Sequence, residues 1–154
     1  MSQARIRQAG PDDALVVAAL TLQCALHRGG TSEPGFLDRF AAAWLRDHQA
    51  HPTWIAEQAG EHAGYLQADV LSALPWPGDG GRGGTLHVVR FFVRPSFRGQ
   101  HIGEALLRTA AQSARERGLA ALQMRPGPKT RGLCERVGLS PAGDLMELRL
   151  DEDG

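Results

Sequence analysis

The sequence predicts an α/β fold, a three-layer sandwich around a mixed, mostly antiparallel sheet. Two neighbouring apolar runs flank a polar turn, which is a hairpin signal. A strand, a turn, a helix and a further strand then follow one another between Leu86 and Met124. Such a crossover implies one parallel strand pair within a sheet that is otherwise built from hairpins. Segments with helical spacing of apolar residues precede the hairpin and complete the layers.

Length and composition are those of one compact domain, and we expect a single domain over residues 1–154. The chain has 17 basic and 17 acidic residues, so its formal net charge is zero. No global field attracts a polyanion, and we expect neither a nucleic-acid nor a membrane partner. No apolar run approaches the ~20 residues that span a bilayer.

The two cysteines are Cys24 and Cys134, which allow one disulfide at most. The start of the sequence lacks a basic and then apolar signal segment, so we expect a cytoplasmic protein with reduced thiols. The histidines and cysteines show no spacing typical of a metal site, and no metal is expected.

The elements before the hairpin are a strand and two helices. The strand is expected at Arg5–Arg7. Asp12 is the expected N-cap of a helix whose apolar residues recur from Leu15 to Ala25. A second helix begins near Ser32 and ends before His51-Pro52.

The middle of the chain is expected to form three strands. Thr53–Glu57 and Gly64–Leu71 form the hairpin. The glycines and prolines of Pro75–Gly84 exclude a helix or a central strand, so this segment is expected to be a long loop. Leu86–Val93, rich in β-branched and aromatic residues, is the third strand.

The last third alternates helices and strands. A helix from about Gln100 to Arg117 is expected to end at Gly118, a C-terminal cap. A buried strand at Leu119–Met124 follows, then a short helix at about Thr130–Val137. Leu145–Leu150 is expected to be the final strand.

The segment between the third strand and the next helix carries the strongest functional signal. The first turn of a helix leaves backbone N–H groups unpaired, and the helix dipole adds partial positive charge there. Glycines allow close approach, so successive N–H groups can form an anion nest suited to a diphosphate. An ordinary strand-to-helix turn is the alternative. The segment reads Val93-Arg94-Pro95-Ser96-Phe97-Arg98-Gly99-Gln100-His101-Ile102-Gly103-Glu104-Ala105-Leu106-Leu107.

The pattern Val-x-Pro-x-Phe-Arg-Gly-x-x-Ile-Gly-x-x-Leu-Leu in this segment resembles the acetyl-CoA-binding motif of the GNAT superfamily of N-acetyltransferases. The order of expected elements agrees over nearly the whole chain. Cys134–Leu139 resembles the family's Tyr-Glu-x-x-Gly-Phe segment, and Leu145–Leu150 resembles its last strand.

The resemblance implies that acetyl-CoA is a cosubstrate. Backbone amides of the loop would hold its pyrophosphate, and the strand ending at Val93 would pair with the pantetheine arm. That strand would splay from Leu119–Met124. A bulge in the 90–93 region would aim the amide of Phe92 or Val93 at the thioester oxygen. The implied cofactor-binding residues are Phe91, Phe92, Val93, Arg98, Gly99, Gln100, His101, Ile102, Gly103 and Glu104.

Two residues depart from the family pattern. His101 stands where glycine is usual, which restricts the backbone and crowds the phosphates, although a protonated imidazole can donate to them. Cys134 stands where the family has its usual general acid, a tyrosine. Cys134 is either a proton donor to the leaving thiolate, a small buried apolar residue, or a transiently acetylated nucleophile.

Transfer to an amine needs a base, because an alkyl amine with a pKa near ~10.4 is protonated at neutral pH. Counting back from Val93, the position of the family's frequent glutamate base falls on His87. Histidine titrates in the range that this task needs. Asp69, Glu33 and bulk water are the alternatives.

The expected acceptor is an amine of a small molecule or peptide, and the chain is expected to be a monomer or a homodimer. Two other functions remain open at this point. One is an acyl-CoA-binding sensor or partner module without catalysis. The other is a phosphate-binding scaffold for a different nucleotide.

Overall fold

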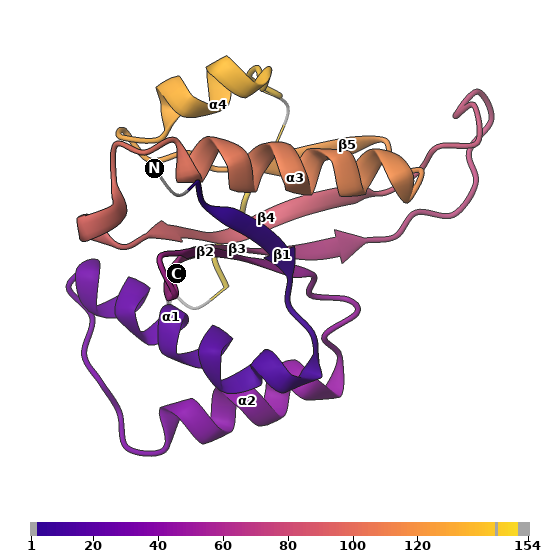
Figure 1. Cartoon of the computed structure of the whole chain (residues 1–154). Coiled ribbons are helices and arrows are strands. Elements are labelled where there is room, and N and C mark those ends of the chain that lie inside the picture. Colours follow the sequence, from indigo (N-terminus) through magenta and orange to yellow (C-terminus); the bar gives the residue numbers. More distant parts are fainter. Residues whose placement is uncertain (1–2, 144, 151–154) are drawn as a thin grey trace.

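A computed structural model describes residues 3–143 and 145–150. One five-stranded sheet has the order β1-β2-β3-β4-β5, and helices cover both of its faces (Figure 1). The predicted three-layer α/β sandwich is confirmed. The elements are β1 (Arg5–Gln8), the 3-10 turn η1 (Pro11–Asp13), α1 (Ala14–His27), α2 (Phe36–Arg46), β2 (Thr53–Gln58), β3 (Glu61–Leu71), β4 (Thr85–Val93), the 3-10 turn η2 (Pro95–Phe97), α3 (Ile102–Glu116), β5 (Ala121–Met124) and α4 (Arg131–Val137).

The sheet combines a meander with one crossover. Strands β1 to β4 pair antiparallel with their neighbours along the chain. Helix α3 connects β4 to β5, and these two strands pair parallel, with Leu86 beside Leu122. A parallel pair needs such a long connection because the chain must return to the same end of the sheet. The predicted mixed topology is therefore confirmed.

Each face of the sheet has its own core. On one face α1 and α2 pack on a cluster that includes Val17, Trp44 and Tyr65. On the other face α3 packs on a cluster that includes Leu66 and Leu106. Figure 1 shows α1 and α2 on one side of the strands and α3 and α4 on the other. Alternate side chains of the central strands enter opposite cores, as the period of two of a strand requires.

The predicted glycine-rich loop lies between β3 and β4 and projects away from the body of the molecule (Figure 1). Its Trp76 is 77% exposed. Gly78, Gly80 and Gly81 all have positive φ, a conformation that side chains oppose. The loop therefore holds its shape through local turns and contributes little to either core.

The predicted final strand is wrong. Residues 145–150 have no strand conformation, and Met146 is 94% exposed. Glu147 forms an ion pair with Arg125, 3.6 Å away, just beyond β5. Alternation of apolar residues favours a strand only where a neighbouring strand supplies hydrogen bonds and a face to cover.

The expected cap at Asp12 is also wrong, by one residue. The carboxylate of Asp13 accepts a hydrogen bond from the Gly10 N–H at 2.9 Å and a bidentate pair from Arg7 at 2.7 and 2.8 Å. A 3-10 turn inserted before α1 makes Asp13 the residue before the helix, and its carboxylate closes that turn and makes no hydrogen bond to the first amides of α1. The guanidinium of Arg7 holds the pKa of Asp13 below its ordinary value.

Both cysteines are free thiols and both are buried. In the part of the chain that the structure describes, no helix is long and apolar enough to cross a bilayer. Within the same part, no three His, Cys, Asp or Glu side chains gather as metal ligands would.

Candidate active site

Strand β4 has two different edges. Along its whole length it pairs with β3, from Thr85 to Val93. With β5 it pairs only from Thr85 to Val88. Because β5 ends at Met124, opposite Val88, no strand of the described chain pairs with residues 89–93 on that side, and this opening in the sheet is the open edge of β4. Unpaired strand edges accept extended ligands through backbone hydrogen bonds.

A β-bulge lies where this opening begins. Ala68 pairs with Val88 and Gln67 pairs with Arg90, which leaves Val89 as the extra residue. The sequence placed the bulge in 90–93, slightly too far along the strand. A bulge leaves little trace in the sequence because it depends on how the two strands are registered.

The bulge changes which amides face the opening. The Arg94 N–H donates to the Ala63 carbonyl at 2.8 Å. Hydrogen bonds in an antiparallel pair serve every second residue. The ladder therefore directs the amide of Phe92 toward β3, and directs those of Phe91 and Val93 toward the open edge.

The loop after β4 presents a row of free amides. The first helical bond of α3 runs from the Ala105 N–H to the His101 carbonyl, 3.1 Å. Among the described residues, no hydrogen bond is made by the backbone N–H groups of residues 99–104. These donors lie at the positive end of the helix dipole. The arrangement suits a phosphate or diphosphate.

Left-handed backbone at two positions shapes this loop. Gly99 has φ +80° and His101 has φ +62°. Glycine adopts this region without cost, whereas a residue with a Cβ is strained there by roughly 1–2 kcal/mol. The restriction expected at His101 is therefore present in the backbone. The imidazole is 81% exposed, with Nδ1 3.7 Å from Glu104 Oε2.

The charged side chains of the loop are turned to neighbours. Arg98 Nε donates to the Val93 carbonyl at 3.1 Å, and its Nη2 lies 3.0 Å from His27 Nε2 at the end of α1. Glu104 accepts from Arg108 at 2.9 Å, and this contact lowers the Glu104 pKa. Gln100 accepts a hydrogen bond from Gln58. The positive charge of Arg98 therefore lies at the end of β4, beside the row of free amides.

Close packing fixes the start of α3 against β4. A Cβ on Gly103 would lie 3.1 Å from the Phe91 ring, closer than ordinary contact. The next residue toward the N-terminus, Ile102, is fully buried. Glycine at 103 therefore lets the helix approach the strand, and it places the free amides next to the open edge.

Phe92 separates the site from α1. Its side chain is buried in the core beneath α1 and α2, and its ring lies 5.8 Å from the His27 ring. Its cross-strand partner is Tyr65, whose pKa burial raises to about 12. The Tyr65 hydroxyl lies 2.9 Å from the Thr21 hydroxyl, which ties α1 to the sheet.

His87 lies before the bulge, on the paired half of β4. Its cross-strand neighbours are Asp69 on β3 and Gln123 on β5. Because Leu86 and Val88 enter the core beneath α3, alternation places His87 on the face of α1 and α2. The side chain is half-buried.

The alternative bases already have partners. Asp69 Oδ1 lies 2.6 Å from His51 Nδ1. Glu33, on the exposed segment before α2, pairs with Arg39. Of the two, Asp69 is the cross-strand neighbour of His87.

Cys134 is buried on α4, and its Sγ lies 3.4 Å from Met124 Sδ at the end of β5. Burial raises the pKa of the Cys134 thiol. The protonated thiol is therefore the form present at neutral pH. It is part of the core beneath α3 and α4, as an apolar side chain would be.

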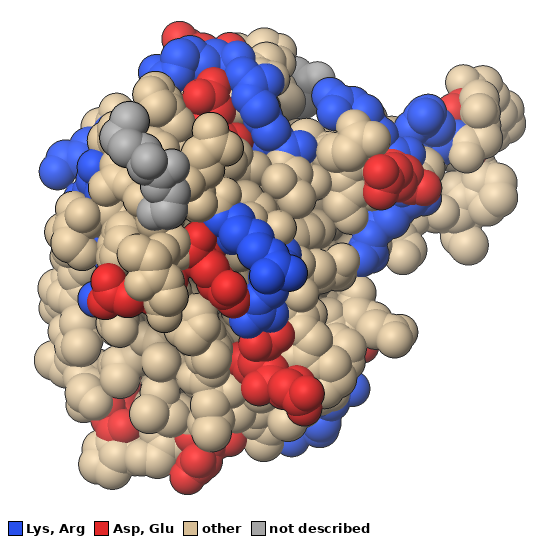
Figure 2. Space-filling model, viewed as in Figure 1, with Lys and Arg blue, Asp and Glu red and all other residues tan. Residues whose placement is uncertain are grey.

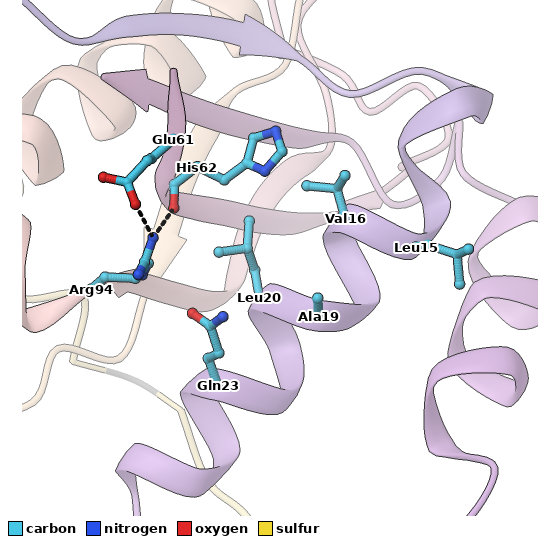
Figure 3. A pocket seen from close by; sticks show the side chains of 8 residues that line it. All are labelled: Leu15, Val16, Ala19, Leu20, Gln23, Glu61, His62 and Arg94. Atoms are coloured by element: carbon cyan, nitrogen blue, oxygen red, sulfur yellow. Dashed lines mark hydrogen bonds and ion pairs between the residues drawn. The ribbon is translucent and has the colours of Figure 1, made fainter. Parts of the chain in front are cut away.

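A separate open hollow lies between α1 and the β2–β3 turn (Figure 3). Figure 3 shows Arg94 directed toward Glu61 and the His62 carbonyl, and the apolar side chains of α1 form the other wall. None of the sequence-predicted site residues lines it. The lining residues are Leu15, Val16, Ala19, Leu20, Gln23, Glu61, His62 and Arg94.

The surface view shows no large single-sign field on the visible face. Basic and acidic side chains are interspersed there (Figure 2). This mixture agrees with the equal numbers of basic and acidic residues. Recognition of an anionic ligand must therefore be local.

Comparison with known proteins gives the class. The family model described as "Acetyltransferase (GNAT) family" matches residues 19–139. The chain therefore belongs to the acetyltransferase (GNAT) family, as its resemblance in sequence predicted. No curated protein sequence matches the chain significantly.

Solved structures share the fold. One is a predicted acetyltransferase with acetyl-CoA from Clostridium acetobutylicum, with TM-score 0.80, 15% identity and coverage of 96% of this chain and 97% of that one. A ribosomal-protein-alanine N-acetyltransferase from Brucella melitensis biovar Abortus 2308 has TM-score 0.72, 24% identity and coverage of 95% and 98%. An aminoglycoside N-acetyltransferase in complex with CoA has TM-score 0.73, 16% identity and coverage of 97% and 95%.

Proposed function

We propose that this chain is an acetyl-CoA-dependent N-acetyltransferase that acts on an amine of a small molecule or peptide. The observation that carries the proposal is the row of free amides at residues 99–104, next to the open edge of β4. One feature suits a diphosphate and the other suits an extended arm with amide groups. Together they match the two parts of CoA.

The proposed reaction is direct attack. The amine nitrogen forms a bond to the thioester carbonyl carbon, and the carbon–sulfur bond breaks. His87, or a water molecule that it holds, takes one proton from the amine. CoA leaves as a thiolate, which needs little help because a thiol pKa is only ~8.5.

The oxyanion that forms during attack needs a donor. Of the two amides named from the sequence, that of Val93 is better placed for this role, because the ladder directs it to the open edge. We assign the amide of Phe92 to the pairing with β3 instead. Well-oriented reactants can gain roughly 7–11 kcal/mol from proximity alone.

A non-catalytic CoA-binding module is the second candidate. The buried contact of Cys134 with Met124 favours it, because the position of the family's usual acid holds a residue that packs as core. Release of free thiol from acetyl-CoA, measured over a panel of amines, separates the two. Acceptor-dependent release supports the enzyme. Tight CoA binding without release for any acceptor supports the module.

A thermal shift with acetyl-CoA, ATP and NAD tests the cosubstrate directly, since a ligand that binds the folded state raises its melting temperature by mass action. We expect acetyl-CoA to give the largest shift. A larger shift with either nucleotide would assign the free amides to a different ligand.

A further inference from the structure

The sheet face beneath α1 and α2 carries a polar strip that continues from the buried Tyr65–Phe92 pair. The next cross-strand pairs on that face are Gln67 with Arg90, and Asp69 with His87. Residues two apart on a strand are separated by about 6.5–7 Å. The cationic Arg90 and the pair of His87 and Asp69 are therefore separated by about the length of a small molecule, so one molecule can contact both.

Two arginines form the cationic end of the strip. Arg90 is exposed, and its Nη1 donates to the Val89 carbonyl at 3.1 Å, at the bulge. Arg28 is exposed at the C-terminal cap of α1, one turn after Cys24. Among the described residues, neither guanidinium forms an ion pair with a carboxylate.

Arg28 and Arg90 both act electrostatically on two groups of the core beneath α1 and α2, the Cys24 thiol and the Tyr65 hydroxyl. Burial raises the pKa of the Cys24 thiol, and Arg28 and Arg90 both act against that rise. Tyr65 joins α1 to β3 through Thr21. Burial also raises the pKa of Tyr65, and Arg28 and Arg90 act against that rise.

His27, the neighbour of Arg28, lies with its ring 5.8 Å from the ring of Phe92, two residues after Arg90 on β4. Arg28 and Arg90 therefore both belong to the region where the end of α1 meets β4.

The other end of the strip is built to receive an amine. The Asp69 carboxylate holds His51 but remains 36% exposed. Asp69 is the direct cross-strand neighbour of His87. A carboxylate attracts an ammonium group, and a neutral imidazole accepts its proton.

We propose that the acceptor is a small amine that also carries a carboxylate or phosphate, with its anionic group bound by Arg90 and Arg28 and its amine directed to His87 and Asp69. The proposal rests on the N-acetyltransferase activity proposed above. Guanidinium groups suit these anions because they donate hydrogen bonds in a planar fork. A neutral amine of equal length would leave both cations without a partner.

The test compares acceptors matched in length, with kcat/KM expressed per concentration of unprotonated amine because a nearby anionic group raises the amine pKa. 4-Aminobutanoate is compared with 4-aminobutanamide, and O-phosphoethanolamine with 2-methoxyethylamine. Hydrogen bonds to charged groups contribute about 1.5–3 kcal/mol, so kcat/KM is expected to favour the better anionic acceptor by roughly 10-fold or more. The carboxylate and phosphate arms identify which anion the site prefers.

Variants locate the preference. Arg90→Ala and Arg28→Ala are each expected to lower the anionic-to-neutral ratio of kcat/KM severalfold, and the double variant to bring it close to one. The control is Arg115→Ala, an exposed arginine on α3 in the opposite layer, which should leave the ratio unchanged. A wild-type ratio near one for both pairs would overturn the proposal.

Binding separates this proposal from the proposed activity. Binding of each acceptor to the CoA-loaded protein is measured by calorimetry and by NMR titration. Tighter binding of the anionic member, lost in the double variant, supports the site even without turnover, and the proposed activity then fails alone. If amines are acetylated but the anionic and neutral members of each pair bind equally well, the proposed acceptor class is wrong and the proposed activity is retained.

Discussion

The two halves of β4 differ although they belong to one continuous strand. From Thr85 to Val88 the strand pairs with β3 on one edge and β5 on the other, so its backbone is used within the sheet. From Val89 to Val93 one edge is open, and the half is available to a ligand. One extra residue separates them. The comparison teaches that a central strand can continue as an edge strand once one neighbour has ended, here with a bulge at the boundary.

The largest effect is expected from truncating the buried ring of the open half. Phe92→Ala removes a side chain that is buried in the core beneath α1 and α2. Truncation of a buried phenylalanine leaves a cavity, so we expect a loss of about 3–5 kcal/mol in the free energy of unfolding. Thermal denaturation followed by circular dichroism measures it.

The matched control for that truncation is Trp76→Ala in the projecting loop. The Trp76 side chain is 77% exposed, so its removal uncovers little apolar surface. The melting temperature should therefore stay close to that of the wild type. Equal losses from the two variants would contradict the burial of Phe92 beneath α1 and α2.

The paired half of β4 is tested through His87. We expect His87→Ala to lower kcat/KM by about 100- to 10,000-fold, the usual contribution of a general base, and to leave acetyl-CoA affinity unchanged. His48→Ala is the matched control, because that imidazole stacks on Trp44 with ring centroids 5.2 Å apart. Steady-state kinetics and calorimetry provide the readouts. Unchanged turnover in the His87 variant would return the role to Asp69 or to solvent.

The open half of β4 is tested through the free backbone amides of residues 99–104, which lie next to it. Gln100→Glu adds a negative charge beside them and can still accept the hydrogen bond from Gln58. We expect acetyl-CoA affinity to fall about tenfold at low salt, and by less at high salt because of screening. Gln112→Glu, an exposed position farther along α3, should have little effect. If both variants bind acetyl-CoA equally well in calorimetry, the diphosphate lies elsewhere.

The smallest effect concerns the strain at His101. His101→Gly removes a side chain from a residue at φ +62°. Relief of strain exceeds the added backbone entropy, so we expect about 0.5–1 kcal/mol of stabilisation. For a chain of this size the melting temperature should rise by about 2–4 °C. A lower melting temperature would show that the imidazole contact with Glu104 outweighs the strain.

Much of the fold could be predicted because local patterns and tertiary packing agree. The hairpin, the crossover and the helix after β4 follow from turn residues and apolar spacing. The final strand failed because alternation at residues 145–150 has no neighbouring strand to act on. The residue before α1 is Asp13 instead of Asp12 because a 3-10 turn changed the count by one residue.

The site could be predicted less completely. The loop at residues 98–104 has a local signal in its glycines. Its amides at 99–104 are free among the described residues, whereas the Arg98 N–H donates to the Pro95 carbonyl. The contact of Arg98 with His27 joins residues 71 positions apart, and no local pattern reports it. The same holds for the pairing of Asp69 with His51 and for the contact of the His27 ring with Phe92, since all of them depend on how α1 and α2 pack on the sheet.

The two thiols lie in different cores, Cys24 beneath α1 and α2 and Cys134 beneath α3 and α4. A disulfide reagent that gives a coloured product with free thiols should therefore react with CoA released by the proposed reaction. It should leave the native protein unlabelled, because both cysteines are buried. After partial unfolding, the rate at which each cysteine becomes labelled reports the loosening of its own layer. The chain thus contains a reporter for each side of its sheet.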